Sequence, residues 1–234
     1  MDNEFCEVDE LGFPHFTAMD YLRFRYLPND RRFVTGESYL WAFKAGYLVY
    51  NKGRILKYAK EYNIPVLLLA GVAVSEAGGK PDRLKGYGIL QLRQLIDIKN
   101  RNNFLSNNTS IGTIAMQLRV AAETMGINPA SLTRTQQFQL SNCLLNDDFN
   151  INIAARHLRD LIIFDYPDTD TASLTDEQLI LAGSRYNRGK ERIKSDFIES
   201  ISAPPGCPTR EYSEYGRRIL EKKETIENIM RIAE

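Results

Sequence analysis

The stretch that decides the fold runs from residue 65 to residue 79 and reads PVLLLAGVAVSEAGG. Pro65 suits the first turn of a helix, and Gly78 with Gly79 suits the turn that follows one. The residues between are apolar on every side of such a helix, so the helix should lie inside the protein. The apolar run is only about half of the ~20 residues that a transmembrane helix needs, so we expect no membrane insertion.

The spacing of apolar residues predicts helices along most of the chain, which gives an all-α fold class. Thr133 with Gln136, and Thr175 with Gln178, have the spacing of capping boxes at helix starts. The expected helices cover residues 35–62, 65–77, 133–146, 150–164, 175–187 and 212–232. We expect three parts: an irregular N-terminal arm (1–34), a helical domain (35–202) and a C-terminal helix packed on it or extending it (203–234).

Composition excludes several classes of protein. The 234 residues carry 30 basic and 30 acidic side chains, so the chain has no overall positive field for binding nucleic acid. Two histidines and three widely spaced cysteines do not form a zinc-binding pattern, and we expect neither a metal nor a cofactor. The cysteines are expected to be reduced thiols. The first ten residues, MDNEFCEVDE, lack the apolar stretch of a signal peptide, so we expect synthesis in the cytoplasm without one.

The residue that points to chemistry is Glu76, at the end of the apolar helix. The negative end of the helix dipole and the loss of water on burial both favour the neutral carboxylic acid. A neutral carboxyl can donate a proton to a departing glycosidic oxygen. Glu76 is therefore the candidate catalytic acid. The alternative on pattern alone is a solvated glutamate where the chain leaves a helix.

Four blocks between residues 64 and 189 resemble, in order, the lysozyme-like superfamily, in particular lytic transglycosylases and goose-type lysozymes. VAVSEAGGKP (72–81) is similar to the apolar helix that ends in the catalytic glutamate of that family. TSIGTIAMQLRVAAETMG (109–126) is similar to a glycine-containing loop that leads to Met-Gln and a helix. DFNINIAARHLRDL (148–161) and LILAGSRYNRG (179–189) resemble two later helices, the last ending in Tyr-Asn-x-Gly.

The resemblance implies a lysozyme-like helical domain in which Glu76 acts as general acid and base. It also implies that the later blocks supply the sugar-binding side chains, which are Ser110, Met116, Gln117, Asn150, Tyr186 and Asn187. The sequence departs from the family pattern at Ala77, Ala154, Arg185 and Arg188.

Two assignments stay open at this stage. GYGILQLR (86–93) is a rival for the second block, and it would place Gln91 rather than Gln117 in the site. No second acidic residue stands at a matched position; Asp82 and Asp97 are near in sequence but read more simply as loop charges. A single glutamate fits a lytic transglycosylase, in which the 6-hydroxyl of the sugar attacks the anomeric centre, and also fits an inverting hydrolase.

The resemblance implies cleavage of the MurNAc-β-1,4-GlcNAc bond in the glycan strands of peptidoglycan. Because no signal peptide is expected, the setting that we favour is an antibacterial effector of a type VI secretion system. Such an effector acts in the periplasm of a target bacterium, and its partners are a secretion carrier and an immunity protein. A phage endolysin of the same chemistry is the alternative setting.

Two further alternatives belong to other functional classes. A Cys/His peptidase or amidase would use Cys143 and His157, although both read more simply as core residues. A catalytically inactive glycan-binding module would keep the scaffold without the reaction.

Overall fold

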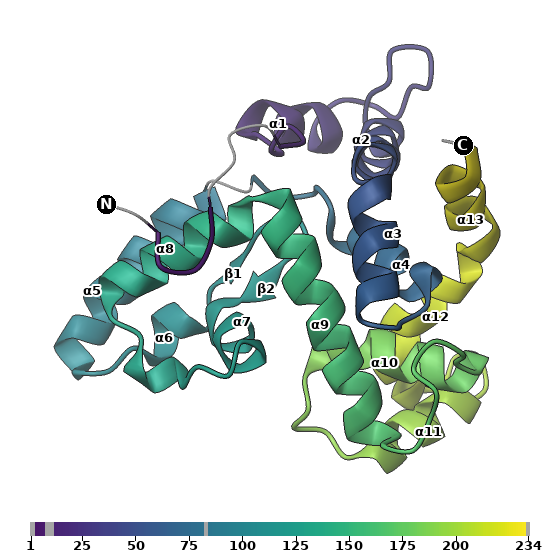
Figure 1. The fold of residues 1–234 in the computed structure, drawn as a ribbon. Coiled ribbons are helices and arrows are strands. Elements are labelled where there is room, and N and C mark those ends of the chain that lie inside the picture. Colours follow the sequence, from purple (N-terminus) through teal and green to yellow (C-terminus); the bar gives the residue numbers. More distant parts are fainter. Residues whose placement is uncertain (1–2, 8–11, 82–83, 233–234) are drawn as a thin grey trace. The chain divides into compact units, whose positions relative to one another are not determined.

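The computed structural model describes residues 3–7, 12–81 and 84–232 (Figure 1). The chain forms two compact units, each built from two separate segments. The first unit contains residues 1–51 and 76–154, and the second contains residues 52–75 and 155–234. The described residues are predominantly helical, which confirms the all-α class, with one small hairpin of two short strands.

The first unit contains most of the short elements. Its helices are α1 (Ala18–Arg25), α2 (Glu37–Tyr50), α5 (Leu90–Asn100), α6 (Phe104–Asn107), α7 (Leu118–Thr124) and α8 (Arg134–Leu145). A π-helix (Leu84–Ile89) leads into α5, and a 3₁₀ turn (Pro129–Ser131) precedes α8. The strands β1 (Ser110–Ile111) and β2 (Met116–Gln117) pair antiparallel, with Ser110 opposite Gln117. The first two turns of α9 (Asp147–Asp165) also belong to this unit.

The second unit is wholly helical over its described residues. It contains α3 (Lys52–Glu61), α4 (Val66–Glu76) up to Ser75, the rest of α9, α10 (Asp176–Arg188) and α11 (Lys194–Ser202). A 3₁₀ turn (Pro208–Ser213) then leads into α12 (Glu214–Glu221) and α13 (Lys223–Ile232). None of the described helices is long and apolar enough to cross a bilayer.

Close helix packing at glycines forms the centre of the second unit. A Cβ atom added to Gly71 of α4 would lie 2.3 Å from Cγ2 of Ile219 on α12. A Cβ added to Gly216 of α12 would lie 2.0 Å from the carbonyl oxygen of Ile180 on α10. Ile219 is fully buried. These contacts hold α4 and α10 against α12.

Several sequence expectations need correction. The arm over residues 1–34 is irregular only in part, because α1 forms there with a capping box between Thr17 and Asp20. The helix expected over 35–62 is two helices, which meet at Asn51. The terminal helix expected over 212–232 is likewise interrupted, at Lys222.

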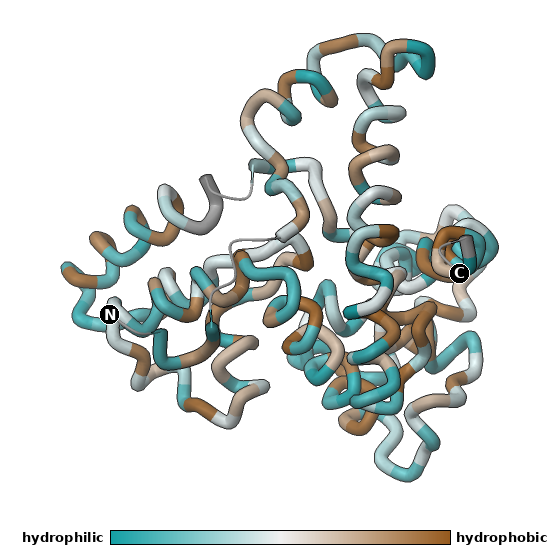
Figure 2. Tube along the Cα trace, turned by 45° about the horizontal axis from the view of Figure 1, so that its top comes forward, coloured by the Kyte–Doolittle hydropathy of each residue, from teal (hydrophilic) through white to brown (hydrophobic). Residues whose placement is uncertain are grey.

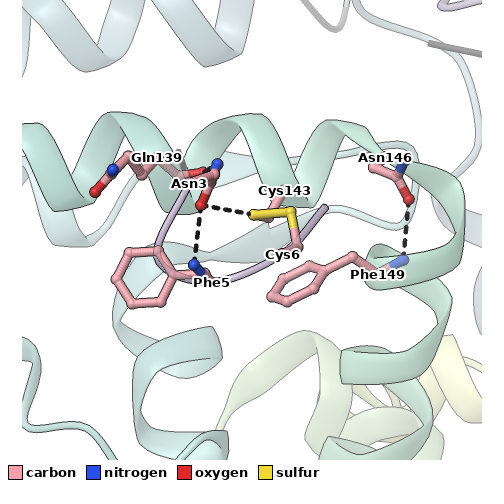
Figure 3. The surroundings of a disulfide bond; sticks show 7 residues. All are labelled: Asn3, Phe5, Cys6, Gln139, Cys143, Asn146 and Phe149. Atoms are coloured by element: carbon pink, nitrogen blue, oxygen red, sulfur yellow. Dashed lines mark hydrogen bonds between the residues drawn. A yellow bond between two sulfur atoms is a disulfide. The ribbon is translucent and has the colours of Figure 1, made fainter. Parts of the chain in front are cut away.

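The expectation of reduced thiols is also wrong. Cys6 in the arm and Cys143 on α8 form a disulfide, with their Cα atoms 5.9 Å apart (Figure 3). The side-chain amide of Asn3 donates a hydrogen bond of 2.9 Å to the carbonyl of Gln139, so the same stretch of arm is held on α8 twice. Only Cys207 is a free cysteine. The pairing escaped sequence reasoning because 137 residues separate the two cysteines.

The asparagine-rich stretch before the hairpin forms a buried polar network. Asp97 of α5 accepts hydrogen bonds from the backbone N–H and the hydroxyl of Ser106, at 2.8 and 2.7 Å. Gln137 of α8 donates to the same hydroxyl and to Asn107, and it accepts a bond of 2.8 Å from Gln94. The network gives hydrogen-bond partners to the buried side chains of Gln94, Asp97, Ser106 and Gln137, which explains the polar composition of this segment.

Candidate functional site

Glu76 lies where the sequence predicts, as the last residue of α4. The helix is buried from Leu68 to Val74, and Ala77 after it is fully buried as well, whereas Glu76 itself is half-buried. The carboxyl group thus stands at the negative end of an apolar helix with restricted access to water. Close packing of Gly71 against Ile219 fixes the helix that carries it.

The turn after Glu76 depends on two glycines. Gly78 and Gly79 have φ angles of +73° and +87°, a region that side chains with a Cβ rarely adopt. A Cβ at Gly78 would lie 2.9 Å from Leu40 and 3.3 Å from Phe16. Phe16 is buried and packs edge-on against Phe43, with ring centroids 4.9 Å apart. The N-terminal arm therefore supports the turn next to the candidate acid, a role that no local sequence signal indicated.

The second block of the resemblance forms the β1–β2 hairpin, and Asn150 holds its turn. The side-chain amide of Asn150 accepts a hydrogen bond of 2.8 Å from the N–H of Ile114 and donates one of 3.0 Å to its carbonyl. A Cβ added to Gly112, whose φ is +88°, would lie 2.4 Å from the carbonyl oxygen of Leu144. Asn150 is 1% exposed, so it positions the hairpin and is not available to contact a sugar.

The remaining residues of this block differ in accessibility. Gln117 ends β2 half-buried, and its side-chain amide oxygen, Oε1, accepts a hydrogen bond of 2.8 Å from Nε of Arg119. Ser110, its partner across the hairpin, is also half-buried. Met116 is buried and belongs to the core. Gln117 and Ser110 are thus the candidate sugar-binding residues of the hairpin, and Met116 is not.

The rival glutamine, Gln91, has a different environment. It is exposed on the first turn of α5, outside the hairpin. Gln117 follows the glycine-containing loop and directly precedes α7, as the second block of the resemblance implies, and Gln91 stays the alternative.

Tyr186 and Asn187 belong to the second unit, near the end of α10. The half-buried ring of Tyr186 packs edge-on against His157 of α9, with centroids 5.9 Å apart. Asn187 is exposed and lines a polar hollow, together with Arg188, Glu191, Arg192, Ile193 and Asp196. Glu76, Gln91, Ser110, Met116, Gln117 and Asn150 belong to the first unit.

Arg185, which departs from the family pattern, holds the loop after α10. It is 1% exposed and makes two hydrogen bonds of 2.8 Å to Asp165, which is also buried. Its remaining nitrogen donates to the carbonyls of Gly189, Lys190 and Arg192. The guanidinium group also lies over the rings of Phe164 and Phe197. Arg185 is a structural residue that fixes the segment after Tyr186 and Asn187.

The two aspartates near Glu76 in sequence, Asp82 and Asp97, are the candidates for a second catalytic carboxylate. Asp97 is buried and accepts hydrogen bonds within the first unit, so it is a structural acceptor and not a loop charge. Asp82 lies outside the described residues. Sequence reasoning missed Asp160 on α9, one turn after His157. Burial raises the pKa of Asp160, opposed by the nearby charges of Lys190, Arg156 and Arg159.

The chemistry of a cysteine peptidase is absent from Cys143. Its sulfur is bonded to Cys6 and the residue is fully buried, so it has no thiol with which to attack a substrate. The peptidase alternative on Cys143 and His157 is therefore wrong.

Among the residues that the structure describes, no group of three His, Cys, Asp or Glu side chains is arranged to hold a metal ion.

The geometry of the first unit suits acid–base chemistry at Glu76. A carboxyl group closes a buried helix, a glycine turn follows it, and Gln117 and Ser110 lie on the hairpin of the same unit. No family model, curated protein or solved structure matches this chain.

Proposed function

We propose that the chain is a glycosidase that cleaves the MurNAc-β-1,4-GlcNAc bond of peptidoglycan, with a lysozyme-like catalytic domain. The observation that carries the proposal is the place of Glu76: half-buried at the C-terminal end of an otherwise buried helix. A carboxyl group at the end of a buried helix can serve as the proton donor that glycosidic cleavage needs.

In the proposed reaction, Glu76 donates its proton to the leaving glycosidic oxygen. The resulting carboxylate then removes a proton from the attacking hydroxyl, which is either the sugar's own 6-hydroxyl or water. The N-acetyl group of the substrate assists at the anomeric carbon, so the scheme needs no second protein carboxylate. Gln117 and Ser110, on the hairpin of the first unit, are the residues that we propose to hold the sugar.

The disulfide supports a place of action outside a reducing cytoplasm. Disulfides persist in oxidising compartments such as the periplasm, where peptidoglycan is accessible. We propose delivery as an antibacterial secretion-system effector with a carrier and an immunity protein, and a phage endolysin is the alternative. Co-purification with the product of a neighbouring gene that encodes a signal peptide would favour the effector.

The test compares purified sacculi treated with wild type and with Glu76→Gln. The variant keeps the size of the side chain but cannot donate the proton, so release of muropeptides should fall by about 10²–10⁴-fold. The matched control is Glu61→Gln, which changes an exposed glutamate at the end of α3 and should leave the rate unchanged.

Mass spectrometry of the products separates the two reaction types, because 1,6-anhydro ends mark a transglycosylase and reducing ends mark a hydrolase. Equal release by wild type and Glu76→Gln would refute the proposal. Binding of wild type to sacculi without any release would instead indicate an inactive glycan-binding module.

The choice between the two glutamines has its own test. If Gln117 binds the sugar, as we propose, Gln117→Leu should raise KM for soluble glycan fragments, whereas Gln91→Leu should not. The reverse result would transfer the role to Gln91.

A further inference from the structure

The large apolar residues of helix α5 lie mainly on its exposed side, and two of the three residues that it buries are polar. The residues that it buries in the first unit are Leu90, Gln94 and Asp97, of which two are polar. Its exposed positions carry large apolar residues instead, and Figure 2 shows several hydrophobic (brown) positions along this helix. The exposed side chains are Leu92 at 60%, Leu95 at 65%, Ile96 at 42% and Ile98 at 43%.

The orientation of α5 is fixed, because its buried polar side chains form hydrogen bonds within the first unit. Gln94 donates hydrogen bonds to Gln137 and to the carbonyl of Arg134, while Asp97 accepts three from α6. Rotating α5 to bury its apolar side would break all of these bonds. Leu92, Leu95, Ile96 and Ile98, with the neighbouring Ile89 and Phe104, therefore form an exposed apolar surface, which we name the α5 face. Clustered exposure of this kind marks an interaction site.

The sequence of α5 and of the residues that follow it carries mainly positive charge. Between residues 84 and 122 the sequence has five basic residues and one acidic residue. That acidic residue is Asp97, which is buried. Lys99 and Arg101 are exposed at the C-terminal end of α5, and Lys99 follows Leu95 by four positions, on the same side of the helix. An occupant that complements this surface is apolar within and negatively charged at its edge.

We propose that the α5 face docks on the surface of an anionic phospholipid bilayer, with α5 lying in the plane of the interface. Aliphatic side chains on one side of a helix, bordered by Lys and Arg, are the pattern of interfacial helices. The helix is only ~16 Å long, so it rests at the interface and does not cross the ~30 Å core. This proposal does not depend on Glu76.

Two other occupants fit the surface less well. A second copy of the chain would carry the same Lys99 and Arg101, so it would bring no added negative charge to complement them. Protein partners usually bind through Trp, Tyr and Arg anchors, whereas the α5 face consists mainly of leucine and isoleucine. A bilayer requires only apolar area and positive charge.

The experiment is co-sedimentation of the oxidised protein with vesicles of equimolar phosphatidylglycerol and phosphatidylcholine, and with vesicles of phosphatidylcholine alone. Wild type should bind the anionic vesicles at least about tenfold more tightly than the neutral ones. A triple variant, Leu92→Gln with Leu95→Gln and Ile96→Gln, should bind the anionic vesicles about a hundredfold more weakly or worse.

The matched control changes three exposed apolar residues on other helices, as Val49→Gln with Leu56→Gln and Ile163→Gln, and should bind as wild type does. Circular dichroism checks that both triple variants stay folded. Absence of vesicle binding by wild type, or equal binding by the two triple variants, would overturn the proposal. A concentration-dependent dimer of wild type that only the α5 triple variant abolishes would overturn it too, in favour of a second copy.

Discussion

Removing the disulfide should lower the free energy of unfolding by several kcal/mol. The bond joins residues that are 137 positions apart, so it closes a long loop in the unfolded chain. The chain-entropy relation then gives about 5 kcal/mol at 25 °C as an upper value, and measured losses for native disulfides lie between about 2 and 5 kcal/mol. The change is Cys6→Ala with Cys143→Ala; alanine leaves no buried hydroxyl at Cys143, which is fully buried.

Urea unfolding, followed by circular dichroism with and without a phosphine reductant, measures the loss. The reductant should shift the midpoint of wild type to that of the double variant and leave the double variant unchanged. Cys207→Ala is the matched control, because that cysteine is free and its loss should leave the midpoint where it is. Thiol titration of unfolded, unreduced wild type should find one thiol, and reduction should expose all three. Three thiols before reduction, or equal midpoints for wild type and double variant, would refute the reasoning.

Three further predictions concern single positions, the first with a matched control. Gly112→Ala should lower the free energy of unfolding by several kcal/mol, because the added Cβ meets a backbone carbonyl at 2.4 Å. The control Gly126→Ala has a similar positive φ but open space around the Cβ, so it should lower the free energy of unfolding by only about 1 kcal/mol. Equal losses in urea unfolding would contradict this prediction. Arg185→Met should cost about 3–5 kcal/mol, since it leaves the buried aspartate of its ion pair without a counter-charge; an unchanged thermal midpoint would argue against it. Burial and a hydrogen bond to Asp20 raise the pKa of Tyr39 to about 12. The contribution of Tyr39 to the free energy of unfolding is therefore complete below pH 10. It is lost as the pH rises towards 12, because the tyrosine ionises at a lower pH in the unfolded chain than in the folded chain. Tyr39→Phe should therefore lower the free energy of unfolding by about 1 kcal/mol at pH 7, and its stability should fall less than that of wild type as the pH rises. Parallel curves of stability against pH for the two proteins would exclude this role of the Tyr39 hydroxyl.

Elements with strong local chemistry could be predicted from the sequence. The capping box of Thr133 and Gln136 forms both of its hydrogen bonds, and so does that of Thr175 and Gln178. The buried helix that ends in Glu76 also forms as predicted. In each case the deciding interactions lie within a few residues of one another, so the pattern contains them.

Elements that depend on distant partners could not be predicted. The segment after Asp97 is rich in polar residues and looks like a solvated loop, but hydrogen bonds with α6 and Gln137 bury Asp97, Ser106 and Asn107. Asn150 resembles a sugar-binding amide, yet it is used by the hairpin turn thirty-six residues away. Arg185 resembles a surface charge, and only the fold reveals its partner, Asp165.

The arm and Asp147 limit where the chain can be shortened. The carboxylate of Asp147 is 4% exposed and accepts a hydrogen bond of 2.7 Å from the backbone N–H of Phe13 and one of 3.3 Å from Asn51. A truncated protein that starts at Thr17 would lack the Phe13 N–H that donates to Asp147. It would also lack the rings of Phe13 and Phe16, so the aromatic side of α2 would be uncovered. Fragments designed for expression or for fusion to a carrier should therefore retain the N-terminal arm, even though the candidate acid lies sixty residues beyond it.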